Sequence, residues 1–238
     1  MAVDKSSSQR PFTKASTLDI KVYGEEVEQV SEFKYLGAII SADGSLDKEL
    51  SARLQKATGA FNSLYPVWNN RNIWTKTKIR IYKAAVITIL CYGCETWNTT
   101  VAQMRRLESF HQRSMRKILK IRWFHKVKNV EVLRRANTGC LEDHIASMRL
   151  RWFGHVARMP EERLPHYLQS WAPEHGKRSR GGQRKTLQTV VTADAKRFMG
   201  RTNISFSELQ TLAADRINWR QMVTSKRDIN LGAGYSTC

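Results

Sequence analysis

Three cysteines and one histidine have a spacing that could bind a metal ion. Cys91 and Cys94 form a C-x2-C pair, and Cys140 and His144 form a C-x3-H pair that begins 46 residues later. Four such side chains can hold zinc tetrahedrally. The first pair, however, ends an apolar stretch, where a free cysteine behaves as a small buried hydrophobe, and the wide separation is unlike a compact zinc knuckle. We therefore expect no metal and no cofactor in this chain.

The remaining residues with catalytic potential form no recognisable motif. The six histidines are scattered, and the sequence has no H-E-x-x-H, no G-x-S-x-G and no Walker loop. Two-metal polymerase chemistry needs closely placed carboxylates, and the chain has no Asp-Asp pair. These observations argue against an enzyme and against a small-molecule substrate, and they favour a binding protein.

A basic run with an internal glycine pair is a candidate phosphate site. It carries five cations and no acid, namely Lys177, Arg178, Arg180, Arg184 and Lys185. Gly181 and Gly182 would let the backbone approach a phosphate, and the start of a following helix would supply free amides. The alternatives are a solvated loop or a nuclear-import signal.

The charge of the whole chain points to the same class of partner. The 238 residues include 40 Lys and Arg against 21 Asp and Glu, a formal charge of +19. Residues 1–50 are net acidic, whereas residues 101–150 carry 12 cations and 4 acids. A field of this sign attracts polyanions, so we expect RNA, DNA or an RNA–DNA hybrid as partner.

A membrane partner is not expected. No apolar stretch reaches the roughly 18 to 20 residues of a membrane helix, and no basic amphipathic stretch with an exposed aromatic face stands alone. The first seventeen residues contain no apolar signal segment. We therefore expect an intracellular protein, nuclear or cytoplasmic.

Hydrophobic periodicity predicts a chain made mostly of helices. Residues 18–41 mix β-branched and aromatic residues and predict a small antiparallel β element. Apolar spacings of three and four then predict a helix that carries Leu50 to Leu64 and is ended by Pro66, followed by helices over 75–91, 100–121, 129–136, 141–159, 186–199 and 207–223. Thr100 with Gln103, and Ser205 with Glu208, have the form of capping boxes.

The predicted helix over 100–121 is a second candidate nucleic-acid surface. Its apolar face is Leu107, Phe110, Ile118 and Ile121. Cations crowd the rest of its surface, and those we expect to contact nucleic acid are Arg105, Arg113, Arg116, Lys117 and Lys120. Any surface helix has a charged face, but here the cations far exceed the acids.

The segment Arg-Trp-Phe-Gly-His-Val over 151–156 has two readings. Trp152 and Phe153 could stack on bases, but the apolar residues around them favour core packing. Gly154 predicts a close approach between helices, and His155 is expected to be packed beside Trp152.

These patterns predict a mainly α fold, a helical bundle with a small N-terminal antiparallel β hairpin. We expect the following segments: 1–17 disordered, 18–44 β hairpin, 45–125 first helical region, 126–172 second helical region, 173–185 basic Gly-rich loop, 186–225 C-terminal helices and 226–238 flexible tail.

Five motifs in a fixed order carry a resemblance to a known family. They are FKYLGAIISADGS (33–45), LCYGCETW (90–97), RLESFHQRSMRKIL (106–119), RWFGHVARM (151–159) and RSRGGQRK (178–185). In this order they resemble the C-terminal third of the endonuclease and reverse transcriptase of RTE-like or CR1-like non-LTR retrotransposons. The similarity spans roughly residues 18–222.

The resemblance implies a location for the β hairpin and the helices. The Phe-x-Tyr-Leu-Gly segment is similar to the primer grip at the end of the palm, which implies that Lys34 and Tyr35 lie near a primer terminus. Phe33 and Tyr35 occupy alternating strand positions, and this alternation alone does not decide whether they pack in the core or contact the primer. The helices that follow resemble the thumb and a basic C-terminal region.

The chain departs from this family where chemistry is concerned. The family's catalytic Tyr/Phe-x-Asp-Asp motif has no counterpart here, so Mg²⁺ is expected only for a full-length parent. The leading hypothesis is a nucleic-acid-binding fragment of a retrotransposon reverse transcriptase. The alternatives are a truncated or misassembled gene model of an active RNA-directed DNA polymerase and a domesticated basic binding module.

Overall fold

The computed structural model describes residues 21–170 and 186–229, and it divides into two units. The first unit ends at Ser45, and the second begins at Leu46. Each unit is described by itself below.

Two short hairpins make up the described part of the first unit. Strands β1 (Lys21–Val22) and β2 (Glu25–Glu26) form one antiparallel pair, and β3 (Glu32–Tyr35) and β4 (Ala38–Ser41) form the other. In the second pair Tyr35 lies opposite Ala38, so that Leu36 and Gly37 alone make the turn. Both turn residues have positive φ, 47° and 84°, as a two-residue turn that matches strand twist requires. The predicted single hairpin over 18–44 is therefore two hairpins.

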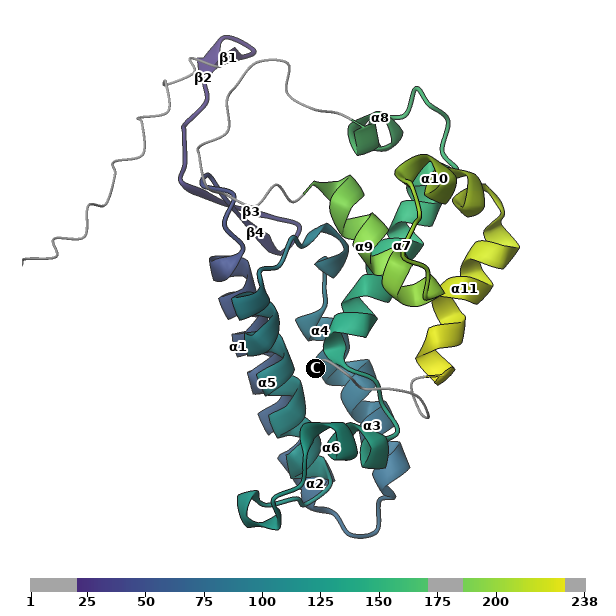
Figure 1. Cartoon of the computed structure of the whole chain (residues 1–238). Helices are drawn as coiled ribbons and strands as arrows, with labels where there is room; N and C mark the ends of the chain where they lie inside the picture. The colour runs from purple at the N-terminus through teal and green to yellow at the C-terminus, as the bar shows by residue number, and fades with distance from the viewer. Residues whose placement is uncertain (1–20, 171–185, 230–238) are drawn as a thin grey trace, which may run out of the picture. The chain divides into compact units, whose positions relative to one another are not determined.

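Helices account for almost all of the regular structure in the second unit (Figure 1). They are α1 (Asp47–Ser63), α2 (Tyr65–Asn69), α3 (Thr75–Tyr82), α4 (Thr88–Leu90), α5 (Val101–Ile118), α6 (Asn129–Ala136), α7 (Leu141–Ala157), α8 (Leu164–Ser170), α9 (Leu187–Met199), α10 (Phe206–Ala214) and α11 (Arg216–Ile229). A π-helical turn η1 (Lys83–Ile87) joins α3 to α4, and the 3₁₀ turns η2 (Cys94–Thr96) and η3 (Trp123–His125) precede and follow α5. The mainly α fold with a small antiparallel β element is confirmed.

The first hydrophobic core lies among α1 to α6 and the start of α7. The predicted stripes supply it: Leu50, Ala57 and Phe61 of α1 are buried, as are Leu107, Phe110 and Ile118 of α5. Aromatic rings fill its centre, where Phe61 stacks on Trp68 with ring centroids 5.2 Å apart. The Trp68 indole N–H donates to the Phe61 carbonyl oxygen at 2.8 Å, so the only polar atom of this buried side chain is satisfied.

The second core surrounds the C-terminal half of α7, which α9, α10 and α11 cover (Figure 1). Phe153 is fully buried and Trp152 is half-buried, so the packing interpretation of this segment is confirmed for Phe153. Gly154 permits the predicted close approach, because a Cβ atom there would lie 2.2 Å from Nε1 of Trp219 on α11. That Nε1–H donates to the Leu150 carbonyl oxygen at 2.9 Å.

Four local predictions were wrong. Pro66 does not end a helix: α1 stops at Ser63, and Pro66 lies in the first turn of α2, where a missing N–H costs nothing. The predicted helix ranges stop at 159 and resume at 186, so they missed α8, in whose first turn Pro165 lies. The helix expected over 207–223 is broken at Asp215 into α10 and α11. His155 is exposed rather than packed.

Candidate nucleic-acid interface

A stripe of cations follows the solvent face of α5. Arg106, Arg113 and Lys117 recur at spacings of seven and four and therefore fall on one face of α5, and Lys120 follows two residues after the end of the helix. All four side chains are exposed. We call these four residues the α5 stripe. The capping box of Thr100 and Gln103 fixes the start of the helix, with bonds of 3.2 and 2.9 Å.

Arg105 and Arg113 project from the helix without an acidic partner among the described residues. Arg105 is exposed beside the α5 stripe. The Nε–H of Arg113 donates to the Ser109 carbonyl oxygen one turn earlier, at 3.2 Å. The remaining donors of both guanidinium groups point to solvent and can bind phosphate.

Within the described part of the chain, Arg106 is the one cation of the α5 stripe that has an acidic neighbour. Its guanidinium lies 3.6 Å from the Asp47 carboxylate and donates to the Ser51 hydroxyl at 3.1 Å, both on α1. The carboxylate of Asp47 also accepts from the Gln103 amide at 3.0 Å. One end of the α5 stripe is thus joined to α1 and partly neutralised.

The other end of the α5 stripe is joined to α2. The Lys117 ammonium lies 4.8 Å from the centroid of the Tyr65 ring, a cation–π contact, and Lys120 donates to the Asn69 side chain. The pKa of Tyr65 is lowered by the hydrogen bond to Asn69 and by the charges of Lys117 and Lys120. The potential at this end of the α5 stripe is therefore positive.

Arg116 differs from the other cations expected to bind nucleic acid. It is half-buried, and its guanidinium donates at 2.8 Å to both the Val127 carbonyl oxygen and the Asn129 side chain. These bonds hold the segment between α5 and α6 against α5. Arg116 therefore contributes charge while it positions a loop.

Glu108, the single acid of α5, points away from the α5 stripe. Its carboxylate accepts from the Glu142 backbone N–H at 2.9 Å and so caps the start of α7. Burial raises its pKa, although the amides of Glu142 and Leu141 oppose the shift. Because this carboxylate faces inward, the solvent face of α5 keeps its positive charge.

The remaining predicted site residues belong to the hairpin and to the basic run. Lys34 and Tyr35 lie on β3, and both are exposed, Tyr35 by 57%. Phe33 is exposed by 56%, so neither aromatic residue of the strand is core. Lys177, Arg178, Arg180, Arg184 and Lys185 lie outside the described residues, and their role stays a prediction.

The cysteines expected to be small buried hydrophobes lie in the first core. Cys91, Cys94 and Cys140 are buried. A hydrogen bond with Cys94, together with burial, raises the pKa of Cys91 strongly, which keeps the thiol protonated. Across the part of the chain that the structure describes, no three His, Cys, Asp or Glu side chains are grouped so that they could hold a metal ion.

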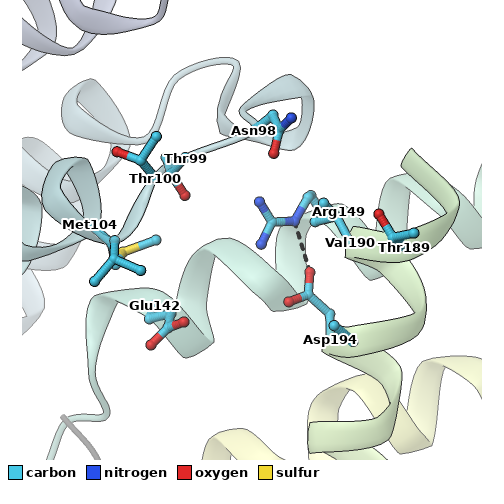
Figure 2. Close-up of a pocket in the computed structure, with 11 residues that line it drawn as sticks. Asn98, Thr99, Thr100, Met104, Glu142, Arg149, Thr189, Val190 and Asp194 are labelled. Atoms are coloured by element: carbon cyan, nitrogen blue, oxygen red, sulfur yellow. Dashed lines mark hydrogen bonds and ion pairs between the residues drawn. The ribbon is translucent and has the colours of Figure 1, made fainter. Parts of the chain in front are cut away.

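A pocket of about 400 Å³ lies between the start of α5, α7 and α9 (Figure 2). Its charged groups already have partners. The Arg149 guanidinium donates to Asp194 and to the Trp97 carbonyl oxygen, both at 2.8 Å, and Glu142 lies 3.1 Å from Arg197. Burial raises the pKa of Asp194, while Arg149 opposes the shift. We interpret this pair as a link between elements rather than as a binding group.

Residue patterns missed one feature close to the α5 stripe. Trp123 and Phe124, in the turn η3, are exposed by 88% and 52%. Apolar periodicity carries no signal for a three-residue turn, so these aromatic residues escaped notice. The detectable signal was an aromatic pair directly flanked by cations, in the sequence Arg-Trp-Phe-His-Lys.

Comparison with known proteins finds a transposon-derived relative. The chain is 27% identical over 212 residues to an uncharacterized transposon-derived protein of Caenorhabditis elegans. The matched region covers 83% of this chain and 72% of the relative. No family model matches the chain. No solved structure matches it either. The similarity supports a transposon origin for this chain.

Proposed function

We propose that this chain binds the phosphate backbone of nucleic acid through the α5 stripe and the cations beside it. The observation that carries the proposal is the one-sided charge of α5. Its solvent face presents Arg105, Arg113 and Lys117, and Lys120 follows just after the helix. These four cations have no acidic partner among the described residues, while Glu108 turns inward to cap α7. A transposon-derived relative is consistent with a nucleic-acid partner.

The pairing of acids elsewhere in the second unit supports the same assignment. Glu131 forms ion pairs with Arg134 at 2.6 Å and Arg135 at 2.7 Å, and its pKa is lowered to about 2 mainly by the bond to Arg134. Glu49 is paired with Arg53 at 2.6 Å inside the fold. These acids form ion pairs with nearby arginines, so they do not neutralise the positive charge of the α5 stripe.

The finer part of the proposal concerns the parent protein. The ordered motifs resemble the primer grip, thumb and basic C-terminal region of a non-LTR retrotransposon reverse transcriptase. Lys34, Tyr35 and the run over 177–185 would then be further contacts. Because this chain has no Asp-Asp pair, the proposal gives it a binding role, and primer extension by the purified chain with Mg²⁺ should stay at background.

Binding to duplex DNA at several salt concentrations tests the proposal. If five to eight phosphates are neutralised, log K should fall against log[salt] with a slope of roughly −4 to −7, at about −0.9 per contact. The double substitution Arg113→Ala and Lys117→Ala should flatten the slope by about two units. It should weaken all sequences alike, because backbone contacts do not read bases.

A variant with the same change of net charge supplies the control. Arg134→Ala with Arg135→Ala removes two cations that Glu131 already engages, and the slope should change by less than about one unit. Equal effects of the two double variants would mean that only net charge matters. An unchanged slope in the Arg113 and Lys117 variant would contradict the proposal.

A further inference from the structure

The segment from Leu119 to Lys128, here called the α5–α6 loop, exposes two adjacent aromatic rings. Trp123 is exposed by 88%, whereas Trp68, Trp97 and Trp219 are buried. Phe124 is exposed by 52%. Large rings lose favourable free energy when they face water, so a pair of them at a loop tip suggests a partner that covers them.

The α5–α6 loop is held in one shape by specific hydrogen bonds. Arg116 donates to the Val127 carbonyl oxygen and to Asn129, which ties the far end of the loop to α5. In the turn itself the His125 N–H donates to the Arg122 carbonyl oxygen at 3.1 Å, and the Arg122 N–H donates to Nδ1 of His125 at 3.2 Å. A loop already ordered before binding loses little entropy when it binds.

The rings are packed edge to face. Trp123 and Phe124 have centroids 5.9 Å apart and planes at 81°, and Phe124 and His125 have centroids 4.7 Å apart and planes at 82°. This arrangement fixes the orientation of the indole, while its high exposure leaves ring surface open to solvent. An oriented, accessible indole is the side chain on which an unpaired base stacks.

The charges around the rings are all of one sign. Lys120, Arg122, Lys126 and Lys128 are exposed within the α5–α6 loop, and Lys117 lies at the end of α5 that leads into it. The sequence contains no acid between Glu108 and Glu131. The pKa of Lys78 on α3 is lowered mainly by burial and, to a smaller extent, by the charge of Lys120. The loop thus combines ring faces with cations that can follow a phosphate backbone.

We propose that the α5–α6 loop binds unpaired nucleotides, with a base stacked on Trp123 and the strand's phosphates held by Arg122, Lys126 and Lys128. This inference rests on the proposed nucleic-acid-binding function and assigns to it a site for single strands. A lipid surface fits less well, because the loop offers two rings among cations and no helical apolar face that could lie in a bilayer.

The test compares an unstructured single strand with a blunt duplex at one salt concentration. Trp123→Ala should weaken binding of a short oligothymidine or oligouridine by about 5- to 150-fold, the range for loss of one base-stacking contact. Duplex affinity and its salt slope should stay unchanged, because no cation is removed. Trp123→Phe should recover most of the single-strand affinity, since an aromatic face is restored.

Two controls make the result specific. Trp74→Ala removes another exposed tryptophan, 82% exposed at the start of α3, and should leave single-strand affinity unchanged. Vesicles of phosphatidylserine and phosphatidylcholine test the lipid alternative. Circular dichroism verifies that each variant is folded.

The outcomes separate this inference from the function on which it rests. Single-strand affinity that is equal for wild type and Trp123→Ala, or lowered equally by Trp74→Ala, would overturn the site while duplex binding remained. Vesicle binding that depends on Trp123, without single-strand binding, would also overturn it. Failure of the wild-type chain to bind either duplex or single strand would overturn the proposed function itself.

Discussion

Gly154 and His111 are single residues whose environments leave little room for change. Gly154 lies under the rigid indole of Trp219, which is 4% exposed, and His111 is 3% exposed between α3 and α7. One position is limited by shape and the other by charge. Each therefore allows a prediction that a single substitution can test.

At Gly154 we predict a loss of stability on adding one methyl group. The new Cβ would lie 2.2 Å from Nε1 and 2.5 Å from Cδ1 of Trp219, so α11 must shift or the bond from Trp219 to Leu150 must break. Gly154→Ala should lower the free energy of unfolding by on the order of 2 kcal/mol in urea titrations.

Gly59 on α1 is the matched control for this substitution. A Cβ atom there meets nothing within 4 Å, so Gly59→Ala should raise the free energy of unfolding by up to about 1 kcal/mol through helix propensity. If Gly154→Ala were as stabilising as Gly59→Ala, the close approach of α7 and α11 would be wrong.

His111 predicts acid sensitivity. Its Nδ1 lies 3.0 Å from the Tyr82 hydroxyl, and burial lowers its pKa from 6.5 to about 4, with smaller contributions from Lys83 and His144. Between these two pH values the unfolded chain binds a proton that the folded chain excludes. Stability from this group is therefore complete above about pH 6.5 and is lost as the pH falls towards 4.

The measurement is the difference between wild type and His111→Gln across pH 4 to 7. The wild-type free energy of unfolding should fall faster with acidification, by up to about 1.4 kcal/mol per pH unit for one proton. Because Glu108 and Asp194 titrate in both proteins, their contributions cancel in the difference. Parallel curves for the two proteins would show that His111 does not exclude the proton.

At the scale of elements, α7 connects the two hydrophobic cores. Leu141 and Ile145 belong to the first core, whereas Leu150 and Phe153 belong to the second. Arg149, between them, joins α7 to Asp194 of α9 (Figure 2). Its guanidinium also donates to the carbonyl oxygen of Trp97, the residue after η2. The coupling between cores thus depends partly on one buried ion pair.

Breaking this ion pair from one side should be costly. Arg149→Met leaves the buried Asp194 carboxylate without its main partner, and we predict a loss of about 3–5 kcal/mol in the free energy of unfolding at pH 7. The loss should be smaller at pH 4.5, because burial already raises the pKa of Asp194 and the acid can become neutral.

The double variant Arg149→Met with Asp194→Leu is the control. It replaces both charges by apolar groups of similar size and should recover most of the stability lost in the single variant. Additive losses in the two single variants would instead show that the two side chains do not interact.

The helices that could be predicted are those with a periodic buried face. The stripes of α1, α3 and α5 were confirmed because each helix repeats buried apolar residues at helical spacing. These are Leu50 and Ala57, Ile79 and Tyr82, and Leu107 and Phe110. Short elements carry too few residues for a period, so α2, α8 and η3 were missed or misassigned. The break at Asp215 was missed because apolar residues continue on both sides of it.

The candidate site could be predicted only as a set of cations. The sequence placed Arg105, Arg113, Arg116 and Lys117 on one helix, but it could not show that Arg116 is committed to Val127 and Asn129. Nor could it show that Glu108 turns inward, since both facts depend on contacts between segments distant in the chain. The aromatic pair of the α5–α6 loop stood out only through the exposure of its rings in the folded chain.

At the scale of the whole molecule, charge and hydrophobic core are distributed unevenly between the two units. Both hydrophobic cores of the described chain consist of residues after Ser45. Residues 1–45 carry seven acidic and five basic side chains, whereas the rest of the chain is strongly basic. The second unit should therefore contain the determinants of both stability and nucleic-acid binding.

Deletion of residues 1–45 tests this division. We predict that residues 46–238 fold alone with a helical far-UV spectrum and a cooperative unfolding transition, because no side chain of either described core is removed. Duplex affinity should change by less than about threefold, and the salt slope by less than about one unit. The reason is that the deleted segment is net acidic, and Lys34 is the exposed cation of its second hairpin. A loss of affinity above about tenfold, with folding intact, would show that Lys34 and Tyr35 make the contacts that the resemblance implies. The double substitution Lys34→Ala and Tyr35→Ala in the full chain should then reproduce that loss.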